Sequence, residues 1–237
     1  MTLDHSLPQV RSQRGLLPKV RPQIPARRIS FFVKFDLWVS TARSVDGLWV
    51  GSIEDKPWPG LSRVESALRL IRDRDPLSYS RVTRYLDRIW VRIVLGSLGE
   101  YQRQLNACVL DKHFVLSATT TVEKIASTII HEVTHARLEH WGIAYDEKAR
   151  SRIEAICVRR ELSFVRKVPG GEMLREGLAA SLNWYASEQG LFSDASLHES
   201  HVQGSIEALR QLGVPSWLIG SVLKLRGLRL ALRGDVD

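Results

Sequence analysis

His131-Glu132-Val133-Thr134-His135 stands just past the middle of the chain, and its spacing governs how the rest is interpreted. In an α-helix, residues four apart share one face and lie about 6 Å apart along the axis, so both imidazoles can reach one ion. Glu132 is rotated from His131 by one residue, which places its carboxylate beside the position that such an ion leaves open for water. The pattern therefore predicts a helical zinc site with two histidine ligands and with Glu132 as general base.

The flanking residues predict that this motif lies on a capped helix over residues 120–141. Thr120 and Glu123 have the spacing of a capping box, in which Thr120 accepts a hydrogen bond from the amide of Glu123. Gly142 tolerates the left-handed backbone with which many helices end. Asp146 can then cap a second long helix that returns along the first.

A catalytic zinc site needs a third protein ligand, and the returning helix, residues 146–167, offers one. If the two helices are antiparallel, a rise of about 1.5 Å per residue brings Glu154 to the height of the histidines. Glu147 and Glu161 share its face but lie roughly 10 Å too low and too high. Glu154 is therefore the predicted third ligand, and the site is expected to hold one zinc ion per chain.

His131-Glu132-x-x-His135, followed after 18 residues by Glu154, resembles the gluzincin metallopeptidases, the group that includes thermolysin and the zinc aminopeptidases. The resemblance covers about residues 107–165. It implies a zincin-like fold, zinc held by the two histidines and Glu154, Glu132 as general base, and hydrolysis of peptide bonds. It also implies that the strand around residues 108–116 is the edge strand on which such enzymes lay an extended peptide.

The chain departs from this group in two places. Thermolysin and its relatives have an aspartate four residues after the ligand glutamate, whereas this chain has Val158, so the residue that orients a ligand histidine is unassigned. The chain also lacks the Gly-x-Met-Glu-Asn stretch of the zinc aminopeptidases. Glu176, in a Glu-Gly-Leu-Ala run like the third-ligand segment of some other gluzincins, stays the alternative third ligand.

Further polar residues near the motif have chemistry that a metal site can use. Cys157 lies one turn beyond Glu154 and is interpreted as a buried thiol, with a redox-sensitive role at the zinc as the alternative. His140 lies off the metal-facing side of its helix and is interpreted as a capping or surface residue. An oxyanion-stabilising side chain is expected beside the metal. The candidates for it are Tyr145, Tyr185, His198 and His201.

The chain ahead of the motif predicts a small sheet. Residues 31–39 and 47–51 are rich in strand-forming side chains, and residues 89–95 and 107–116 make a second such pair. The second pair is expected to form a hairpin, whose loop of about a dozen residues is long enough to predict a functional role. Two short helices are expected between the pairs, over residues 64–74 and 78–88.

Behind the motif the apolar periodicity is helical, so the expected class is α+β, with a small N-terminal sheet and a predominantly helical C-terminal half. Residues 31–237 are expected to form one zincin-like domain. Its expected parts are strands and short helices (31–118), the motif helix (120–141), the third-ligand helix (146–167) and C-terminal helices (172–232).

Residues 1–30 differ in composition from the rest of the chain. They carry six Lys and Arg residues against Asp4 alone, and so supply +5 of the net charge of +8. They also hold four of the nine prolines and few large apolar residues, which leaves little surface to bury. We predict a mobile basic arm whose residues 11–28 either stay solvated or bind an anionic partner such as nucleic acid, lipid or an acidic protein.

Composition excludes several other classes of protein. With 44% hydrophobic and 25% charged residues, the chain is neither wholly disordered nor fibrous. Its longest uncharged runs are about a dozen residues, against the roughly 20 apolar residues that cross a bilayer, so no transmembrane segment is expected. No signal-peptide pattern is seen, and two cysteines make at most one disulfide, which favours a cytoplasmic location.

These observations predict a zinc-dependent metallopeptidase that acts on peptide or protein substrates. Two alternatives stay open. One is a non-catalytic, zinc-stabilised module with a regulatory or nucleic-acid-associated role. The other is a zinc hydrolase of different substrates, because the attacking water is the same in either case.

Overall fold

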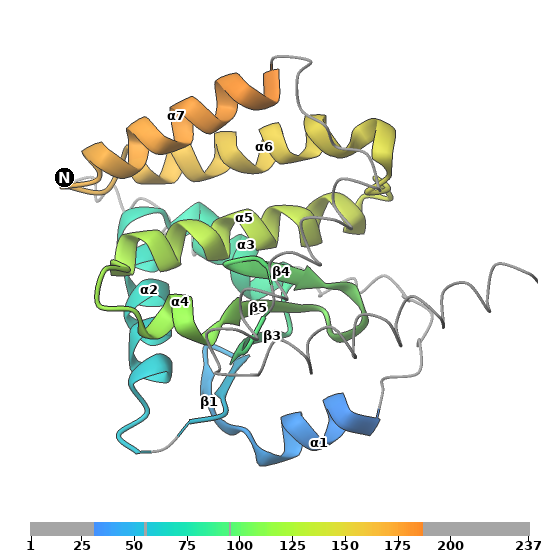
Figure 1. Cartoon of the computed structure of the whole chain (residues 1–237), viewed down its shortest axis with the longest axis vertical. Helices are drawn as coiled ribbons and strands as arrows, with labels where there is room; N and C mark the ends of the chain where they lie inside the picture. The colour runs from blue at the N-terminus through green and yellow to red at the C-terminus, as the bar shows by residue number, and fades with distance from the viewer. Residues whose placement is uncertain (1–30, 55, 95, 187–237) are drawn as a thin grey trace, which may run out of the picture.

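The computed structural model describes residues 31–54, 56–94 and 96–186. The expected basic arm and the helices expected after residue 187 lie outside the described residues. Within them the protein is α+β, with one mixed sheet and with helices on both of its faces (Figure 1). This agrees with the predicted class.

The sheet has the strand order β1-β2-β3-β5-β4. Its strands are Thr41–Val45 (β1), Leu48–Ser52 (β2), Arg88–Arg92 (β3), Gly99–Gln102 (β4) and Ala107–Asp111 (β5). The three central strands run parallel, whereas β1 and β4 are antiparallel to their neighbours. β4 therefore forms one edge of the sheet, and it lies beside the helix that carries the motif.

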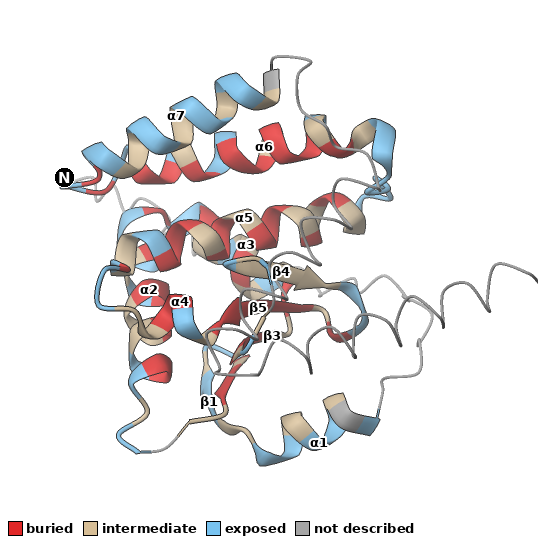
Figure 2. Ribbon diagram, viewed as in Figure 1, coloured by how far each residue is buried: buried red, intermediate tan, exposed pale blue. Residues whose placement is uncertain are grey.

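Most of the described helices stack on one face of the sheet. The helices are Phe31–Val39 (α1), Pro59–Arg74 (α2), Pro76–Tyr85 (α3), Lys112–Leu116 (α4), Val122–His140 (α5), Glu147–Val165 (α6) and Glu172–Ala186 (α7). α5 packs on α2, α3 and the sheet, α6 packs on α5, and α7 packs on α6 (Figure 1). α6 is buried on the side that faces α5, whereas α7 is exposed on its outer side (Figure 2).

Alternation along the strands builds a separate core on each face of the sheet. Cys108 and Leu110 of β5 join the core under α2 and α5, while Val109 between them joins a smaller core under α1. Successive side chains of a strand point to opposite faces, so one apolar run can serve both cores. Such continuous apolar runs are typical of central parallel strands.

The prediction of a strand over residues 31–39 is wrong, because this stretch forms α1. Its strand-forming residues also fit a helical spacing: Val33 and Leu37, four residues apart, both pack into the smaller core. The strand expected at 47–51 is confirmed as β2, and it pairs with β1. The helices expected over residues 64–74 and 78–88 are confirmed as α2 and α3.

The predicted hairpin over residues 89–95 and 107–116 is wrong as well. The two strands, β3 and β5, are parallel neighbours, and the segment that joins them contains β4 and a short 3-10 helix, Arg103–Leu105. The expected edge strand is therefore misplaced: β5 is an interior strand with all five residues buried, and the chain turns into α4 at Lys112. The edge is β4, which lies in the segment predicted from the sequence to be the hairpin loop.

The two long helices around the motif agree with their predictions to within a few residues. α5 begins one residue later than expected, because Thr121 rather than Thr120 caps it and accepts a hydrogen bond from the Lys124 amide, at 3.2 Å. Gly142 has a φ of 76°, as a helix-ending glycine should. Asp146 caps α6 by accepting from the Ala149 amide at 2.8 Å.

Candidate metal centre

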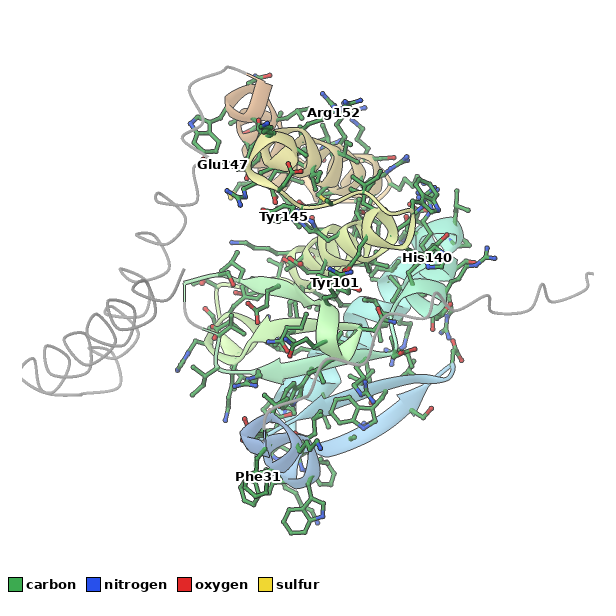
Figure 3. All side chains as sticks on the ribbon, turned by 90° about the vertical axis from the view of Figure 1, so that its right-hand side faces the viewer. Phe31, Tyr101, His140, Tyr145, Glu147 and Arg152 are labelled. Carbon is green, nitrogen blue, oxygen red and sulfur yellow. The ribbon has the colours of Figure 1, made fainter. Side chains whose placement is uncertain are left out.

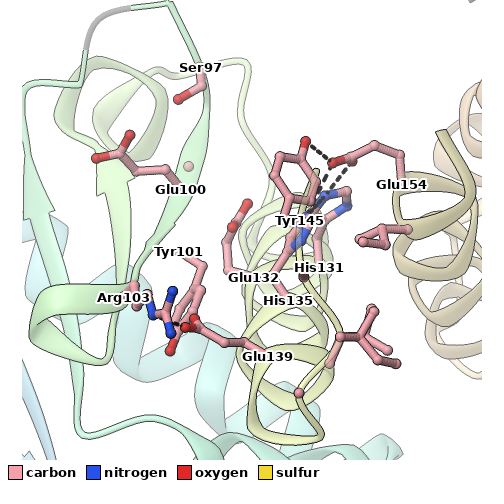
Figure 4. Close-up of a pocket in the computed structure, with 16 residues that line it drawn as sticks. Ser97, Glu100, Tyr101, Arg103, His131, Glu132, His135, Glu139, Tyr145 and Glu154 are labelled. Atoms are coloured by element: carbon pink, nitrogen blue, oxygen red, sulfur yellow. Dashed lines mark hydrogen bonds and ion pairs between the residues drawn. The ribbon is translucent and has the colours of Figure 1, made fainter. Parts of the chain in front are cut away.

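Three side chains from α5 and α6 meet between the two helices. The Nε2 atoms of His131 and His135 lie 3.1 Å apart. Glu154 reaches both of them, with Oε2 at 3.1 Å from His131 Nε2 and Oε1 at 3.4 Å from His135 Nε2 (Figure 4). In a tetrahedral zinc site with bonds of about 2.0–2.1 Å, neighbouring donor atoms lie about 3.3 Å apart. The spacing and the chemistry of this donor set therefore fit zinc.

The antiparallel return of α6 is what brings Glu154 to the histidines. The turn at residues 141–146 reverses the chain, and Glu154, Cys157 and Glu161 then face α5 from the buried side of α6. The structure thus brings together the three residues predicted as ligands, and that they bind zinc stays a prediction. The alternative ligand, Glu176, lies exposed on α7 and does not line the cavity beside the motif.

Glu161 supplies the orienting partner that the sequence analysis left unassigned. Its Oε1 lies 2.6 Å from Nδ1 of His131, and Ser127 donates a hydrogen bond to its Oε2 at 2.7 Å. Glu161 was excluded as a ligand because it lies two turns beyond Glu154. Because α6 runs antiparallel to α5, a residue two turns further along α6 lies nearer the start of α5, where Ser127 precedes His131. Glu161 therefore meets His131 at Nδ1, the nitrogen on the side away from Glu154. The sequence does carry one indication of this contact: Glu161 lies seven residues after Glu154, and so on the same face of α6.

The charges around the histidines and burial keep Glu154 ionised and His135 neutral near pH 7. Burial alone would raise the pKa of Glu154, but the hydrogen bond and charge of His131 outweigh it and lower that pKa to about 2. Burial and the neighbouring His131 lower the pKa of His135 to about 4. Burial opposes protonation of His131 too, yet its contacts with Glu154 and Glu161 raise its pKa well above the usual value. A metal ion at Nε2 would take the place of the proton that His131 shares with Glu154, while Nδ1 would keep its proton toward Glu161.

Glu132 is buried against the cavity, on the side of α5 next to the two histidines. Burial raises its pKa to about 7; the positive charge of His131 opposes that rise, and the negative charges of Glu154 and Glu161 add to it. A carboxylate in this range can both accept and return a proton near neutral pH. Its surroundings therefore suit the general-base role that the motif predicts.

Tyr145 is the oxyanion candidate that reaches this centre. Its hydroxyl donates to Oε1 of Glu154 at 2.6 Å, and its ring stands edge-on to His135 with centroids 5.3 Å apart. Tyr185, on α7, is not among the cavity-lining residues, although burial and the charges of Glu154 and Glu161 raise its pKa to about 12. The two other candidates, His198 and His201, lie outside the described residues.

Cys157 adds a sulfur donor to the same neighbourhood. Its Sγ and a ring nitrogen of each motif histidine all lie within 4.8 Å of one another. The thiol is fully buried, as predicted, and burial together with the charge of Glu154 raises its pKa. Two donor sets are therefore available to an ion: the histidines with Glu154, or the histidines with Cys157.

His140 is not part of the metal centre. Its ring packs edge-on against the ring of Tyr85, with centroids 5.2 Å apart, and it lies apart from Tyr145 (Figure 3).

An open cavity of about 660 Å³ lies directly beside the centre. One wall comes from the segment around β4, and the opposite wall from α5, α6 and the turn between them (Figure 4). Its lining residues are Ser97, Gly99, Glu100, Tyr101, Arg103, His131, Glu132, His135, Leu138, Glu139, Gly142, Ile143, Ala144, Tyr145, Ile153 and Glu154. The connection between β3 and β5, for which the sequence predicted a functional role, thus contributes much of one wall.

Comparisons of the chain with protein-family models, with curated proteins and with solved structures found no match. None of the described helices is both long enough and apolar enough to cross a membrane.

Proposed function

We propose that the protein is a zinc-dependent metallopeptidase whose ion is held by His131, His135 and Glu154. The spacing of the two Nε2 atoms, and of each from one carboxylate oxygen of Glu154, is 3.1–3.4 Å, and this spacing carries the proposal. The donors are two imidazoles and one carboxylate, which is a set typical of catalytic zinc sites and leaves one position for water or substrate. The adjoining cavity gives a substrate access to that position.

The residues around the ion divide the work of hydrolysis. A bound zinc ion would supply Lewis acidity toward a carbonyl oxygen and a water molecule. Glu132 takes a proton from the attacking water and delivers it to the leaving amine. Glu161 accepts from Nδ1 of His131, which keeps Nε2 available as the donor atom. Tyr145 lines the cavity and donates its single hydroxyl proton to Oε1 of Glu154; rotation of that O–H away from Glu154 would let it donate to developing negative charge instead.

The edge strand β4 favours a peptide as the substrate. Its outer edge carries backbone groups that no neighbouring strand of the described sheet pairs with, and Gly99, Glu100 and Tyr101 line the cavity. An extended peptide can add to such an edge through main-chain hydrogen bonds. This mode would lay the peptide along the cavity beside Glu132.

Zinc analysis and a peptide screen test the proposal together. Wild type should hold about one zinc per chain after dialysis, Glu154→Ala should lose it, and Glu176→Ala should keep it as the matched control. Glu132→Gln should keep zinc and lose cleavage of a mixed fluorogenic peptide library. Equal zinc content in wild type and in a His131→Ala, His135→Ala double variant would contradict the proposed site.

The position of Cys157 favours a second function, because its Sγ and a ring nitrogen of each motif histidine all lie within 4.8 Å of one another. If the Cys157 thiolate joins the histidines and Glu154, four protein donors surround the ion and no position remains for water. Such closed sites stabilise a fold and do not catalyse. The protein would then be a zinc-stabilised binding module, and the cobalt spectrum described in the Discussion separates the two.

A further inference from the structure

α1 has apolar side chains on two opposite sides. Val33 and Leu37 face the sheet and pack into the smaller core with Trp90 and Val109. Phe35, Trp38 and Val39 lie on the other side of the helix and are 50%, 80% and 41% exposed. A helix that covers a sheet normally carries polar residues on its outer face. The second apolar face of α1 is therefore not explained by the packing of the described residues.

The two exposed aromatic side chains lie side by side. The rings of Phe35 and Trp38 contact each other, with centroids 6.0 Å apart and planes tilted by 40°. Asp36, the one acidic residue of α1, is turned away toward Arg92, with 3.5 Å between Oδ2 and Nη2. Lys34 is exposed on the same helix. We call Phe35, Trp38 and Val39 the α1 outer face; Phe31 lies at the start of the same helix (Figure 3).

We propose that the α1 outer face docks onto the surface of an anionic lipid bilayer. Aromatic side chains beside basic ones are typical of helices that lie in the plane of a membrane interface, with their rings at the boundary between headgroups and acyl chains. The charge of the preceding segment is complementary to such a surface: residues 1–30, which lead directly into α1, carry six Lys and Arg residues and one acid. A cationic segment next to such a helix adds attraction to anionic headgroups.

The two competing occupants of this face fit the charges less well. Residues 187–237 contain five Lys and Arg residues against six Asp and Glu, a net charge of −1, so they offer the basic arm much less attraction than an anionic surface does. A second copy of the chain would bring another basic arm to the same place and would repel the first. An anionic bilayer satisfies the apolar face and the basic arm at once.

This surface is independent of the candidate metal centre. α1 covers the sheet face opposite α5, while the metal centre lies between α5 and α6 (Figure 1). Docking through α1 would leave the cavity beside β4 open. Zinc content and peptide cleavage can therefore be measured on the same variants, and they report on folding without depending on lipid.

Vesicle flotation of the full chain tests the proposal. We expect binding to vesicles of phosphatidylcholine with phosphatidylserine. Binding should be weaker by about tenfold or more for a Phe35→Ser, Trp38→Ser double variant, which removes the two aromatic side chains that would be buried in the bilayer surface. Met173→Ser changes an 86% exposed apolar residue on α7 and should bind as wild type does. Raising the salt from about 0.1 to about 1 M shrinks the screening length from about 10 to about 3 Å and should weaken binding.

Three results would overturn the proposal. Equal vesicle binding by wild type and the Phe35→Ser, Trp38→Ser variant would show that another surface attaches. Binding that appears only after residues 187–237 are removed would show that the chain covers this face itself. A wild-type dimer that the double variant converts to monomer, without any vesicle binding, would assign the face to a second copy.

Discussion

Glu161 hydrogen-bonds Nδ1 of His131 at 2.6 Å and so determines which nitrogen of that ring is free to bind a metal. With Nδ1 occupied, Nε2 is the atom that points toward His135 and Glu154. Carboxylates that hold the far nitrogen of a ligand histidine also make its imidazole a stronger donor. Ser127 fixes Glu161 in turn, so the orientation of His131 is set from α5 and α6 together.

Replacing Glu161 should weaken zinc binding without abolishing it. Glu161→Gln keeps the shape of the side chain but accepts a weaker hydrogen bond, and we expect zinc affinity to fall by about 10- to 100-fold, as for comparable orienting groups. Competition with a chromophoric chelator measures this change. Glu147→Gln, which alters an exposed glutamate on the same helix, is the control. Unchanged affinity in Glu161→Gln would mean that the contact with His131 has no role in metal binding.

Cobalt substitution should show which donor set the ion uses. We expect a Co²⁺-loaded protein without a thiolate-to-cobalt charge-transfer band, because the proposed ligands are His131, His135 and Glu154. Cys157→Ser should then leave the spectrum and the metal content unchanged. A near-ultraviolet thiolate band that disappears in Cys157→Ser would instead establish sulfur coordination and favour the closed, non-catalytic site.

Tyr145 should affect turnover more than metal content. Tyr145→Phe removes the hydroxyl that donates to Glu154 at 2.6 Å and that faces the cavity. Loss of an oxyanion donor typically lowers kcat by about 100- to 1000-fold, while zinc stays bound. Steady-state kinetics and zinc analysis of the same preparation check this. Tyr185→Phe is the matched control, and equal losses in both variants would argue against a specific role for Tyr145.

The sequence allowed the metal-facing residues of two helices to be predicted because their spacing is local. His131 and His135 are fixed by helical periodicity, and the position of Glu154 follows from the turn at Gly142 and the rise per residue. The contact of Glu161 with His131 does not follow from backbone height alone, because a glutamate side chain adds several atoms of reach along the helix axis.

The sheet was harder to predict because strand partners are not local. β3 and β5 carry apolar runs that fit a hairpin as well as two parallel strands. What distinguishes the two is the four-residue β4, whose polar sequence Gly-Glu-Tyr-Gln shows little strand propensity and pairs with β5 only in the folded protein. For residues 31–39 the sequence predicts a strand where the structure has the helix α1. Burial of Val33 and Leu37 against the sheet overrides the strand propensity of these residues.

Asp75 should stabilise the protein in a way that depends on pH. It caps α3 through Ser78 and pairs with Lys167, whose Nζ lies 3.0 Å from Oδ2. Burial would raise the pKa of Asp75, but the hydrogen bonds from Lys167 and Ser78 outweigh it and hold the pKa below the usual value. A depressed pKa means that the ionised form favours the folded state, so this contribution is complete above about pH 4 and is lost as the pH falls through the lower, folded-state pKa.

Urea unfolding of Asp75→Ala at two pH values tests this. At pH 7 the variant should be less stable than wild type by about 1–2 kcal/mol, the usual cost of losing a helix cap, plus the loss of the pair with Lys167. The difference should shrink as the pH is lowered below about 4, because Asp75 of the unfolded chain then takes up a proton that the folded protein accepts only at its lower pKa. Asp73→Ala, at an exposed acid two residues earlier near the end of α2, should be nearly neutral at both pH values. A difference between wild type and Asp75→Ala that stays constant with pH would show that the cap, and not the charge, accounts for the stabilisation.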